Sequence, residues 1–600
     1  MGLVDVAKTL THVPALLKLK KGMKPRSLDV ADCFGGRVET NATSIGNNTA
    51  IIFEGRSVTW EELNKLANKY ANYLREAGIQ RGDVVSLVME NRIEFMALLI
   101  GVNKIGATSG LINTNLTGRP LTHCITVTNS KKCIFGAELA QAIHGVSAEL
   151  DFGKEDFLVV DDQEPTQLDW ATNLTQASAE ASDSNPDSTG QVTLGDVALY
   201  IFTSGTTGLP KAAVLSNRRF LMSADMSALA GLKATPKDRI YLCLPLYHGT
   251  GLMIGAGASM CSGASMFIRR KFSASNFLPE VREHNCTCFI YIGELCRYLN
   301  NSPSNPDDHE NPLRAMMGNG MRPDVWLDFK ARFGIKKITE FYGSSEGNVA
   351  FANLMNKDQT VGMTSAEVAL VQYDVHNDEI VRDNAGRCIE VMPGEAGLLL
   401  GKITEDTVFE GYTDTEATEK KILRDALEEG DAWFNTGDLM KVVDVGYTLG
   451  YDHYQFVDRV GDTFRWKSEN VSTNEVGEIL NGFDQVNFCN IYGVEVPGAD
   501  GRAGMAAINL AEGVSELDLE AFSNHARSEL PAYAVPVFLR IQHDIDVTGT
   551  FKMVKGDLRE QAYHTDQFTD PVYVMKSGES VYSPLDDEYL QQIKNAQAGF

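Results

Sequence analysis

Apolar positions along the chain alternate between helical and strand spacing, which indicates helices that follow strands. Residues 59–79 (TWEELNKLANKYANYLREAGI) repeat apolar side chains at helical spacing, with Thr59 placed to cap the first turn and Gly78 placed to end the helix. Residues 84–90 (VVSLVME) are then apolar enough for a buried strand. Because the same alternation continues, the pattern predicts α/β layers with largely parallel sheets.

A run of hydroxyl and glycine residues follows another apolar strand. Residues 197–202 (VALYIF) predict a buried strand, and Ser216 is placed to cap a later helix. Between them stands TSGTTGLPK, in which glycines let the main chain approach an oxyanion, hydroxyls donate hydrogen bonds and a lysine adds charge. The run predicts a loop that leads toward a helix and grips the phosphates of a nucleotide, with contacts from Thr203, Ser204, Gly205, Thr206, Thr207, Gly208 and Lys211.

This loop differs from a Walker motif. A Walker loop has lysine directly after its last glycine, whereas Leu209 and Pro210 intervene here. A plain Ser/Thr-rich surface turn is the alternative interpretation of the segment.

The chain has 600 residues, 43% of them hydrophobic, and a formal net charge of −26. This length predicts a multi-domain soluble enzyme. The negative field repels nucleic acid, which we do not expect as a partner, so that a nucleotide needs a local cationic site. The ten cysteines are scattered, and Cys286, Cys288 and Cys296 lack a second cluster at metal-ligand spacing, which argues against a zinc site. We expect no disulfides and a cytoplasmic location.

Two segments bear on membranes. Residues 1–26 combine apolar positions with six basic residues, a composition that suits an interfacial helix on the inner membrane leaflet and no less an ordinary docked terminal helix. No cleavable signal is expected there. Residues 252–268 are uncharged but rich in Gly, Ala and Ser, and they are too short for a usual span of ~20 residues. We expect a buried segment beside a ligand cavity.

The pattern changes past Asp452. A basic, glycine-containing segment, 457–473 (VDRVGDTFRWKSENVST), precedes a new mixed α/β pattern. It predicts a domain boundary near Asp458. Residues 1–457 would form a large domain of layered, mostly parallel sheets with helices, and residues 458–600 a smaller, mobile α+β domain. Residues 161–196 and 301–312 are expected to be loops.

Five further segments, together with the loop, resemble the adenylate-forming superfamily of acyl-CoA synthetases, adenylation domains and luciferases. They are PLYH (245–248), GNG (318–320), FYGSSEG (341–347), TGD (436–438) and TGTFK (548–552). Each is weak alone, but their order and spacing are specific.

The resemblance implies a role for each matched residue. His248 would be a polar gate at the carboxylate pocket, and Tyr342 would stack on the purine. Ser345, where the family usually has threonine, would meet the α-phosphate. Glu346 would hold Mg²⁺ together with Thr206, because this cation prefers oxygen ligands. Further nucleotide contacts are expected from Gly318, Asn319, Gly320, Gly343 and Ser344.

The C-terminal matches imply the remaining roles. Asp438 would accept hydrogen bonds from the ribose hydroxyls. Arg459 resembles the family arginine that contacts the ribose or phosphate from the domain junction, and Gly461 and Asp462 occupy the hinge. Lys552 matches the catalytic lysine that bridges the acid and the α-phosphate.

A narrower resemblance covers nearly the whole chain. YIGELCRYL (291–299), the 457–473 segment, DPVYV (570–574) and YSPL (582–585) resemble the fatty acid transport protein and very-long-chain acyl-CoA synthetase branch. One departure is Ser468, where the branch has glycine facing the pantetheine channel.

The branch implies an ATP-dependent long-chain or very-long-chain fatty acid–CoA ligase that uses Mg²⁺ and takes coenzyme A as a substrate. A bile acid or carnitine ligase of the same mechanism is the alternative, and so is a lipid-uptake protein in which catalysis is incidental. The acyl site is expected at a run of small residues, although glycines that allow close helix packing would leave the same pattern. That run is Gly251, Gly255, Gly257, Ala258 and Gly263.

Overall fold

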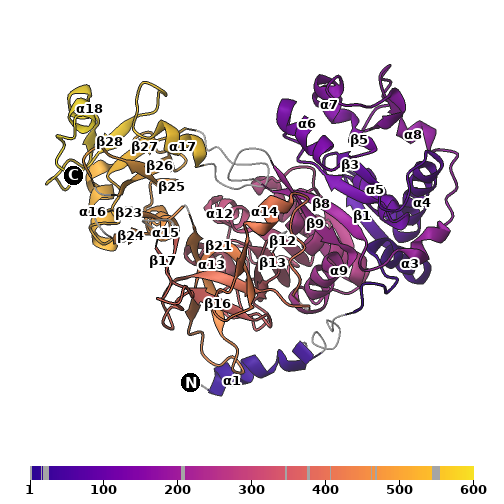
Figure 1. Ribbon diagram of the computed structural model, residues 1–600, viewed down its shortest axis with the longest axis horizontal. Helices are drawn as coiled ribbons and strands as arrows, with labels where there is room; N and C mark the ends of the chain where they lie inside the picture. Colours follow the sequence, from indigo (N-terminus) through magenta and orange to yellow (C-terminus); the bar gives the residue numbers. More distant parts are fainter. Residues whose placement is uncertain are drawn as a thin grey trace.

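The computed structural model consists of a large N-terminal part built on three sheets and a smaller C-terminal lobe (Figure 1). It describes residues 3–14, 16–17, 26–203, 210–344, 347–374, 379–405, 407–460, 462–466, 469–499, 501–543 and 555–600.

The first sheet has seven strands and carries the predicted phosphate loop at one edge. Its spatial order is β7 (Thr172–Asn173), β6 (Phe157–Val160), β5 (Lys132–Gly136), β3 (Val84–Val88), β4 (Thr108–Leu111), β8 (Val197–Thr203) and β9 (Lys211–Ser216). Every neighbouring pair is parallel except β8 and β9.

The second sheet has eight strands, and it too is parallel except for the pair at each edge. Its order is β15 (Ala350–Ala352), β14 (Lys337–Gly343), β13 (Ala315–Asn319), β12 (Cys288–Ile292), β10 (Arg239–Leu242), β11 (Ser265–Ile268), β1 (Thr49–Phe53) and β2 (Arg56–Thr59). Consecutive parallel strands need crossovers, and helices supply most of them.

One large apolar core joins these two sheets and the helices packed on them. The helices of this part are α3 (Phe34–Ile45), α4 (Trp60–Glu76), α5 (Ile93–Lys104), α6 (Gly118–Val127), α7 (Ala140–Ser147), α8 (Leu174–Ala177), α9 (Asn217–Met226), α10 (Gly257–Ser262), α11 (Ala274–Glu283), α12 (Gly293–Asn301) and α13 (Pro323–Arg332). Short 3₁₀ turns are η1 (Ala137–Leu139), η2 (Lys154–Asp156) and η3 (Asp187–Gln191), and π-helical turns are η4 (Ser227–Gly231) and η5 (Thr250–Ala256).

The predicted helix at 59–79 is confirmed as α4. Thr59 caps it, and Glu62 completes a reciprocal capping box. The predicted strands at 84–90 and 197–202 are confirmed as β3 and β8.

A third, antiparallel sheet lies in the middle of the molecule (Figure 1). It contains β16 (Val368–Val371), β19 (Gly397–Lys402), β20 (Ile422–Arg424), β21 (Ala432–Val443) and β22 (His453–Arg459), with the short pair β17 (Tyr373–Asp374) and β18 (Glu379–Ile380) and helix α14 (Thr415–Glu419) nearby in sequence.

The C-terminal lobe has its own apolar core, which begins at Phe464 and reaches Ala598. Its elements are β23 (Phe464–Trp466), β24 (Glu469–Val471), α15 (Thr473–Asn481), β25 (Val486–Glu495), β26 (Arg502–Leu510), α16 (Leu519–Glu529), β27 (Phe538–Ile541), α17 (Gly556–Gln561), β28 (Val572–Val574), β29 (Ser583–Pro584) and α18 (Asp587–Lys594). The predicted α/β fold with a smaller second domain is confirmed.

Arg297 on α12 links the C-terminal lobe to the rest of the chain. Its guanidinium donates to the backbone oxygen of Asn487 at 2.6 Å and lies 4.4 Å from the ring centre of Phe488. Both partners stand on β25, so that this contact holds the lobe against α12.

Two local predictions need correction. Residues 211–216 do not lead directly into a helix, because they pair with β8 as strand β9 before α9 begins. The segment 161–196 is not all surface loop, since it contributes β7, α8 and η3.

The N-terminal segment begins with α1 (Leu3–Leu10). Among the residues described above, no helix has the length and apolar character needed to cross a bilayer.

Candidate active site

The predicted phosphate loop joins two antiparallel strands. Thr203 and Lys211, at its ends, are cross-strand partners, and Lys211 Nζ lies 5.8 Å from the ring centre of Tyr412. The loop residues Ser204, Gly205, Thr206, Thr207 and Gly208 lie outside the described residues.

Helix α9 begins directly after β9 with an N-cap residue, Ser216, which is itself held by Glu410. Ser216 Oγ accepts a hydrogen bond from the Arg219 amide at 3.3 Å, as predicted for an N-cap. Glu410 in turn accepts hydrogen bonds from the amide and the hydroxyl of Ser216, at 3.0 and 2.7 Å. The 407–410 segment is thereby fixed beside the helix.

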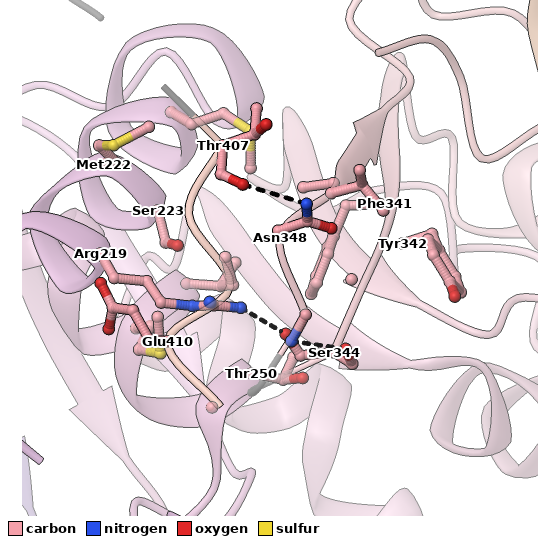
Figure 2. A pocket seen from close by; sticks show the side chains of 18 of the residues that line it. Arg219, Met222, Ser223, Thr250, Phe341, Tyr342, Ser344, Asn348, Thr407 and Glu410 are labelled. Carbon is pink, nitrogen blue, oxygen red and sulfur yellow. Dashed lines mark hydrogen bonds between the residues drawn. The ribbon is translucent and has the colours of Figure 1, made fainter. Parts of the chain in front are cut away.

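A cavity of about 210 Å³ lies between α9, the 248–254 segment, β14 and the 407–410 segment (Figure 2). Four residues predicted from different motifs line it, namely His248, Tyr342, Gly343 and Ser344. Phe341 belongs to the matched FYGSSEG motif, and Met253 and Ile254 belong to the 252–268 segment that was expected beside a ligand cavity. The sequence did not single out the remaining lining residues, which include Arg219, Met222, Ser223, Met226, Thr250, Asn348, Thr407, Val408 and Glu410.

The cavity wall is mostly apolar, with polar groups that hold its rim. Arg219 donates to the backbone oxygen of Ser344 at 2.8 Å, and Asn348 Nδ2 donates to that of Thr407 at 3.1 Å (Figure 2). Methionines at 222, 226 and 253 supply flexible apolar side chains. An apolar cavity with a few placed polar groups is typical of a small-molecule site.

Three predicted nucleotide-binding residues meet at one carboxylate. The Tyr342 hydroxyl donates to Asp438 Oδ2 at 2.6 Å, and Arg459 Nε donates to Asp438 Oδ1 at 3.2 Å. Asp438 is only 5% exposed, and it faces Arg459 across strands β21 and β22. Burial raises the pKa of Tyr342, and the nearby Asp438 charge raises it further, so that the phenol stays protonated and remains a donor.

The predicted GNG segment ends strand β13 where two backbones approach closely. A Cβ at Gly318 would stand 2.1 Å from the Tyr291 backbone oxygen, and Gly320 has a φ of +78°. Both positions therefore require glycine. Asn319 Oδ1 accepts a hydrogen bond from Thr250 at 3.0 Å, which ties this turn to the cavity wall.

Glu340 on β14 supports the same turn through hydrogen bonds, although the sequence did not single it out. Its carboxylate accepts hydrogen bonds from the Met321 amide at 3.0 Å and from the Tyr291 hydroxyl. Burial raises the pKa of Glu340 to about 8. The available signal was an acidic residue in the middle of the strand sequence KITEFYG, between the apolar Ile338 and Phe341.

We expect this pKa to make stability depend on pH. Because the pKa of Glu340 rises from its ordinary 4.5 to about 8 in the folded state, the folded protein keeps a proton that the unfolded chain releases. Stability should therefore fall as pH increases from about 4.5 to about 8, by at most ~1.4 kcal/mol per pH unit from this group. Glu340→Gln should flatten the decline of the melting temperature over that range. The exposed Glu512→Gln is the matched control, and an unchanged slope in Glu340→Gln would contradict the assignment.

The prediction that the glycines of the small-residue run leave space for an acyl chain is wrong. The alternative interpretation, in which these glycines allow close packing of neighbouring segments, is confirmed. A Cβ at Gly251 would lie 2.5 Å from the Pro245 backbone oxygen, and one at Gly257 would lie 2.8 Å from Ala224 Cβ. Gly255 is crowded by Leu242 in the same way. The segment is buried as predicted, and only its start, through Met253 and Ile254, reaches the cavity.

Several predicted residues cannot be located in the described part of the chain. Ser345, Glu346, Gly461, Ser468 and Lys552 lie outside it. Within the described part, no group of three His, Cys, Asp or Glu residues is arranged to hold a metal.

The predicted hinge residue Asp462 is held by two cations of the C-terminal lobe. Arg559 lies 2.6 Å and Lys555 3.5 Å from its carboxylate oxygens. Burial alone would raise the pKa of Asp462, but these cations lower it below its ordinary value. Asp462 therefore stays charged, and its ion pair with Arg559 joins the segment after β22 to helix α17.

Comparisons with known proteins identify the family. The family model described as AMP-binding enzyme matches residues 38–413. A medium/long-chain-fatty-acid–CoA ligase, FadD6 of Mycobacterium tuberculosis, is 38% identical over 98% of this chain and 96% of its own length.

The chain belongs to the AMP-binding enzyme family. Long-chain fatty acid transport protein 2 of Rattus norvegicus is 39% identical over 90% of this chain and 87% of its own length. The predicted resemblance to the adenylate-forming superfamily and to its fatty acid transport protein branch is confirmed, and so is the prediction that the protein is an enzyme.

The fold agrees with solved structures of distant sequence. The crystal structure of the anthranilate CoA ligase AuaEII in complex with anthranoyl-AMP aligns with a TM-score of 0.76 at 20% identity, covering 90% of this chain and 99% of that one. A benzoate CoA ligase from Burkholderia xenovorans aligns with a TM-score of 0.72 at 20% identity, covering 88% of this chain and all of that one. At this identity the likeness concerns the fold alone.

Proposed function

We propose that this protein is an ATP-dependent fatty acid–CoA ligase that works through an acyl-adenylate. The observation that carries the proposal is an apolar cavity adjoining the cluster of Tyr342, Asp438 and Arg459. An acid pocket and a nucleotide site share Tyr342, so that a carboxylate and an α-phosphate would meet between them. The ligase and transport-protein relatives support the same assignment.

The chemistry follows from the weakness of a free carboxylate as an electrophile. A carboxylate oxygen attacks the α-phosphorus of ATP, and the bond from that phosphorus to the bridging oxygen of pyrophosphate breaks. The thiol of coenzyme A then attacks the acyl carbonyl, loses its proton and expels AMP. Because phosphoryl-type transfer needs little covalent work from side chains, the protein contributes position and charge.

We assign the nucleotide contacts to the described cluster and the two flanking loops. Asp438 would accept hydrogen bonds from the ribose hydroxyls, Tyr342 would present its ring to the purine, and Arg459 would contact the ribose or phosphate. The 203–211 loop would bind the phosphates, and Ser345 the α-phosphate. Lys552 would bridge the acid and the α-phosphate during adenylation.

Glu346 and Thr206 are the residues that would hold Mg²⁺. A carboxylate and a hydroxyl are the oxygen donors that this cation prefers. When bound, the ion would supply positive charge to the phosphates.

We assign residues 1–457 to the adenylating domain and residues 458–600 to a domain that changes pose for the second step. Gly461 and Asp462 would act as the hinge, and the pairing of Asp462 with Arg559 supports a defined pose. The thiol step would use the 465–473 segment, where coenzyme A would bind.

We propose a long-chain fatty acid as the substrate, because the cavity wall is mostly apolar. Its wall carries the unbranched side chains of Met222, Met226 and Met253 together with Ile254 and Phe341, and apolar burial of an alkyl chain is favourable by ~0.8 kcal/mol per methylene. His248 would stand at the carboxylate end. A bile acid or carnitine remains the second candidate for the same mechanism.

We propose peripheral contact with the cytoplasmic leaflet of a membrane through residues 1–26. Leu10 and Leu17 support this contact, because they are 50% and 64% exposed. A role in lipid uptake would build on that contact rather than on a separate site.

The experiment that tests the ligase function is coenzyme-A-dependent AMP release from ATP by the purified protein. The acids are saturated chains from short to very long, with a bile acid and carnitine included. We expect a maximum at long chains. Turnover with the bile acid or carnitine alone would overturn the substrate, and no AMP with any acid would overturn the function.

A further inference from the structure

The N-terminal segment has an inner and an outer face. Thr9, His12 and Leu16 repeat at helical spacing and face the protein. Thr9 is 1% exposed, and its hydroxyl donates to the Tyr447 backbone oxygen at 2.9 Å. Leu10 and Leu17 point outward. The segment is therefore tied to the connection between β21 and β22, and Figure 1 shows α1 along the lower edge of the molecule, next to the end marked N.

Leu16 packs on a small apolar cluster directly behind the proposed acyl cavity. The buried centre of this cluster is Ala230, Ala352 and Leu354. Met226 and Phe341 pack against the same centre, and both also line the cavity. Leu16 therefore shares one small apolar cluster with two residues that would touch an acyl chain.

The backbone between these layers is irregular. Helix α9 ends at Met226 and continues as the π-helical turn η4, whose wider turns are common at functional sites. Thr339 and Lys337 on β14 donate to the backbone oxygens of Gly231 and Ala230 and fix the far end of η4. The near end is held as well, because the Ser227 hydroxyl donates to the Ile254 backbone oxygen at 2.8 Å. The adjustable part of this wall is therefore the flexible side chain of Met226.

We propose that Leu16 supports the Met226 and Phe341 wall of the acyl cavity from outside, and that the N-terminal segment thereby limits the length of the acid. This inference rests on the proposed ligase function and names its specificity determinant. Leu16 is a positioning residue, since it packs on the cluster behind the wall and does not line the cavity.

The physical reason is the density of protein interiors. Truncating Leu16 removes the atoms behind a wall made partly of methionine, a flexible side chain, and close-packed surroundings relax into such a space only in part. The remaining volume becomes available to the end of an acyl chain. Each additional methylene that becomes buried is worth ~0.8 kcal/mol, or about fourfold in affinity.

The test compares neighbouring leucines in the full-length protein. For Leu16→Ala, we expect the ratio of kcat/KM for the longest accepted acid to that for octanoate to rise about fourfold or more, while KM for ATP stays constant. Leu17→Ala, which shortens an exposed side chain, should keep the parental ratio. Leu16→Met conserves volume and should restore it.

The outcomes separate this inference from the ligase assignment. Equal loss of kcat for every acid in Leu16→Ala, with no change in the ratio, would overturn the inference and leave the ligase function standing. If the parental protein released no AMP, calorimetric Kd values for the same acids would still compare Leu16→Ala with Leu17→Ala. The same dependence of Kd on chain length in both variants would contradict the proposed support of the cavity wall by Leu16. Melting temperatures identify a variant that fails to fold, in which case Leu16→Val replaces Leu16→Ala with the same expected direction.

Discussion

Replacing Lys552 with alanine is expected to slow formation of the acyl-adenylate by ~10² to 10³, which is the usual loss for one preorganised donor. The proposed ligase needs a cation between the attacking carboxylate and the α-phosphate, because both groups are anionic when they meet. Thioester formation from preformed acyl-AMP should fall much less, since that step no longer brings two anions together.

Two half-reaction measurements check this expectation. ATP–pyrophosphate exchange in the presence of the acid reports adenylation, and coenzyme A consumption with supplied acyl-AMP reports the second step. Lys594→Ala on α18 is the matched control, because Lys594 is exposed and should change neither rate. Equal losses in both half-reactions of Lys552→Ala would remove the role assigned to this lysine.

The regular parts of the fold were predictable because their signals are local. The helix at 59–79 carries its own cap, and the capping box of Thr59 and Glu62 is formed within four residues. The buried strands at 84–90 and 197–202 are short apolar runs, which is how parallel strands covered on both faces appear in a sequence.

The errors arose where distant residues decide the structure. Residues 211–216 form a strand because β8 lies beside them, and that pairing leaves little mark on the segment itself. The glycines at 251, 255 and 257 are small because Pro245, Leu242 and Ala224 approach them. In a sequence, a glycine that makes room for a ligand cannot be distinguished from one that makes room for a neighbouring segment of the same chain.

The candidate site was predictable in its members but not in their contacts. Family motifs named Tyr342, Asp438 and Arg459, which come from separate strands of two sheets. They did not indicate that the Tyr342 hydroxyl would be used on Asp438, or that Glu340 would hold the neighbouring turn. The first contact depends on the geometry of β14 against β21, and the second on the turn that follows the neighbouring strand β13.

Replacing Asp438 with alanine is the other change for which we expect a large effect. A carboxylate that accepts from both ribose hydroxyls forms charge-assisted hydrogen bonds of ~1.5–3 kcal/mol each. Their loss should lower kcat/KM for ATP by ~10² to 10⁴, at ~1.4 kcal/mol for each factor of ten. Initial rates at varied ATP and saturating acid measure this loss. The KM for the acid should change little, because the cavity wall does not include Asp438.

Tyr342→Phe separates the binding of ribose by Asp438 from the structural hydrogen bond that Asp438 accepts from Tyr342. Asp438→Ala also leaves the Tyr342 hydroxyl and Arg459 without their shared acceptor, which costs ~1–3 kcal/mol of stability and calls for a melting control. Tyr342→Phe removes the hydroxyl but keeps the ring and the carboxylate, so that we expect a loss of about tenfold or less in kcat/KM for ATP. Asp444→Ala, an exposed aspartate near the end of the same hairpin, should match the parent. If Asp438→Ala lost stability but bound ATP with parental affinity, Asp438 would serve the fold alone, and the ribose would have to be held elsewhere.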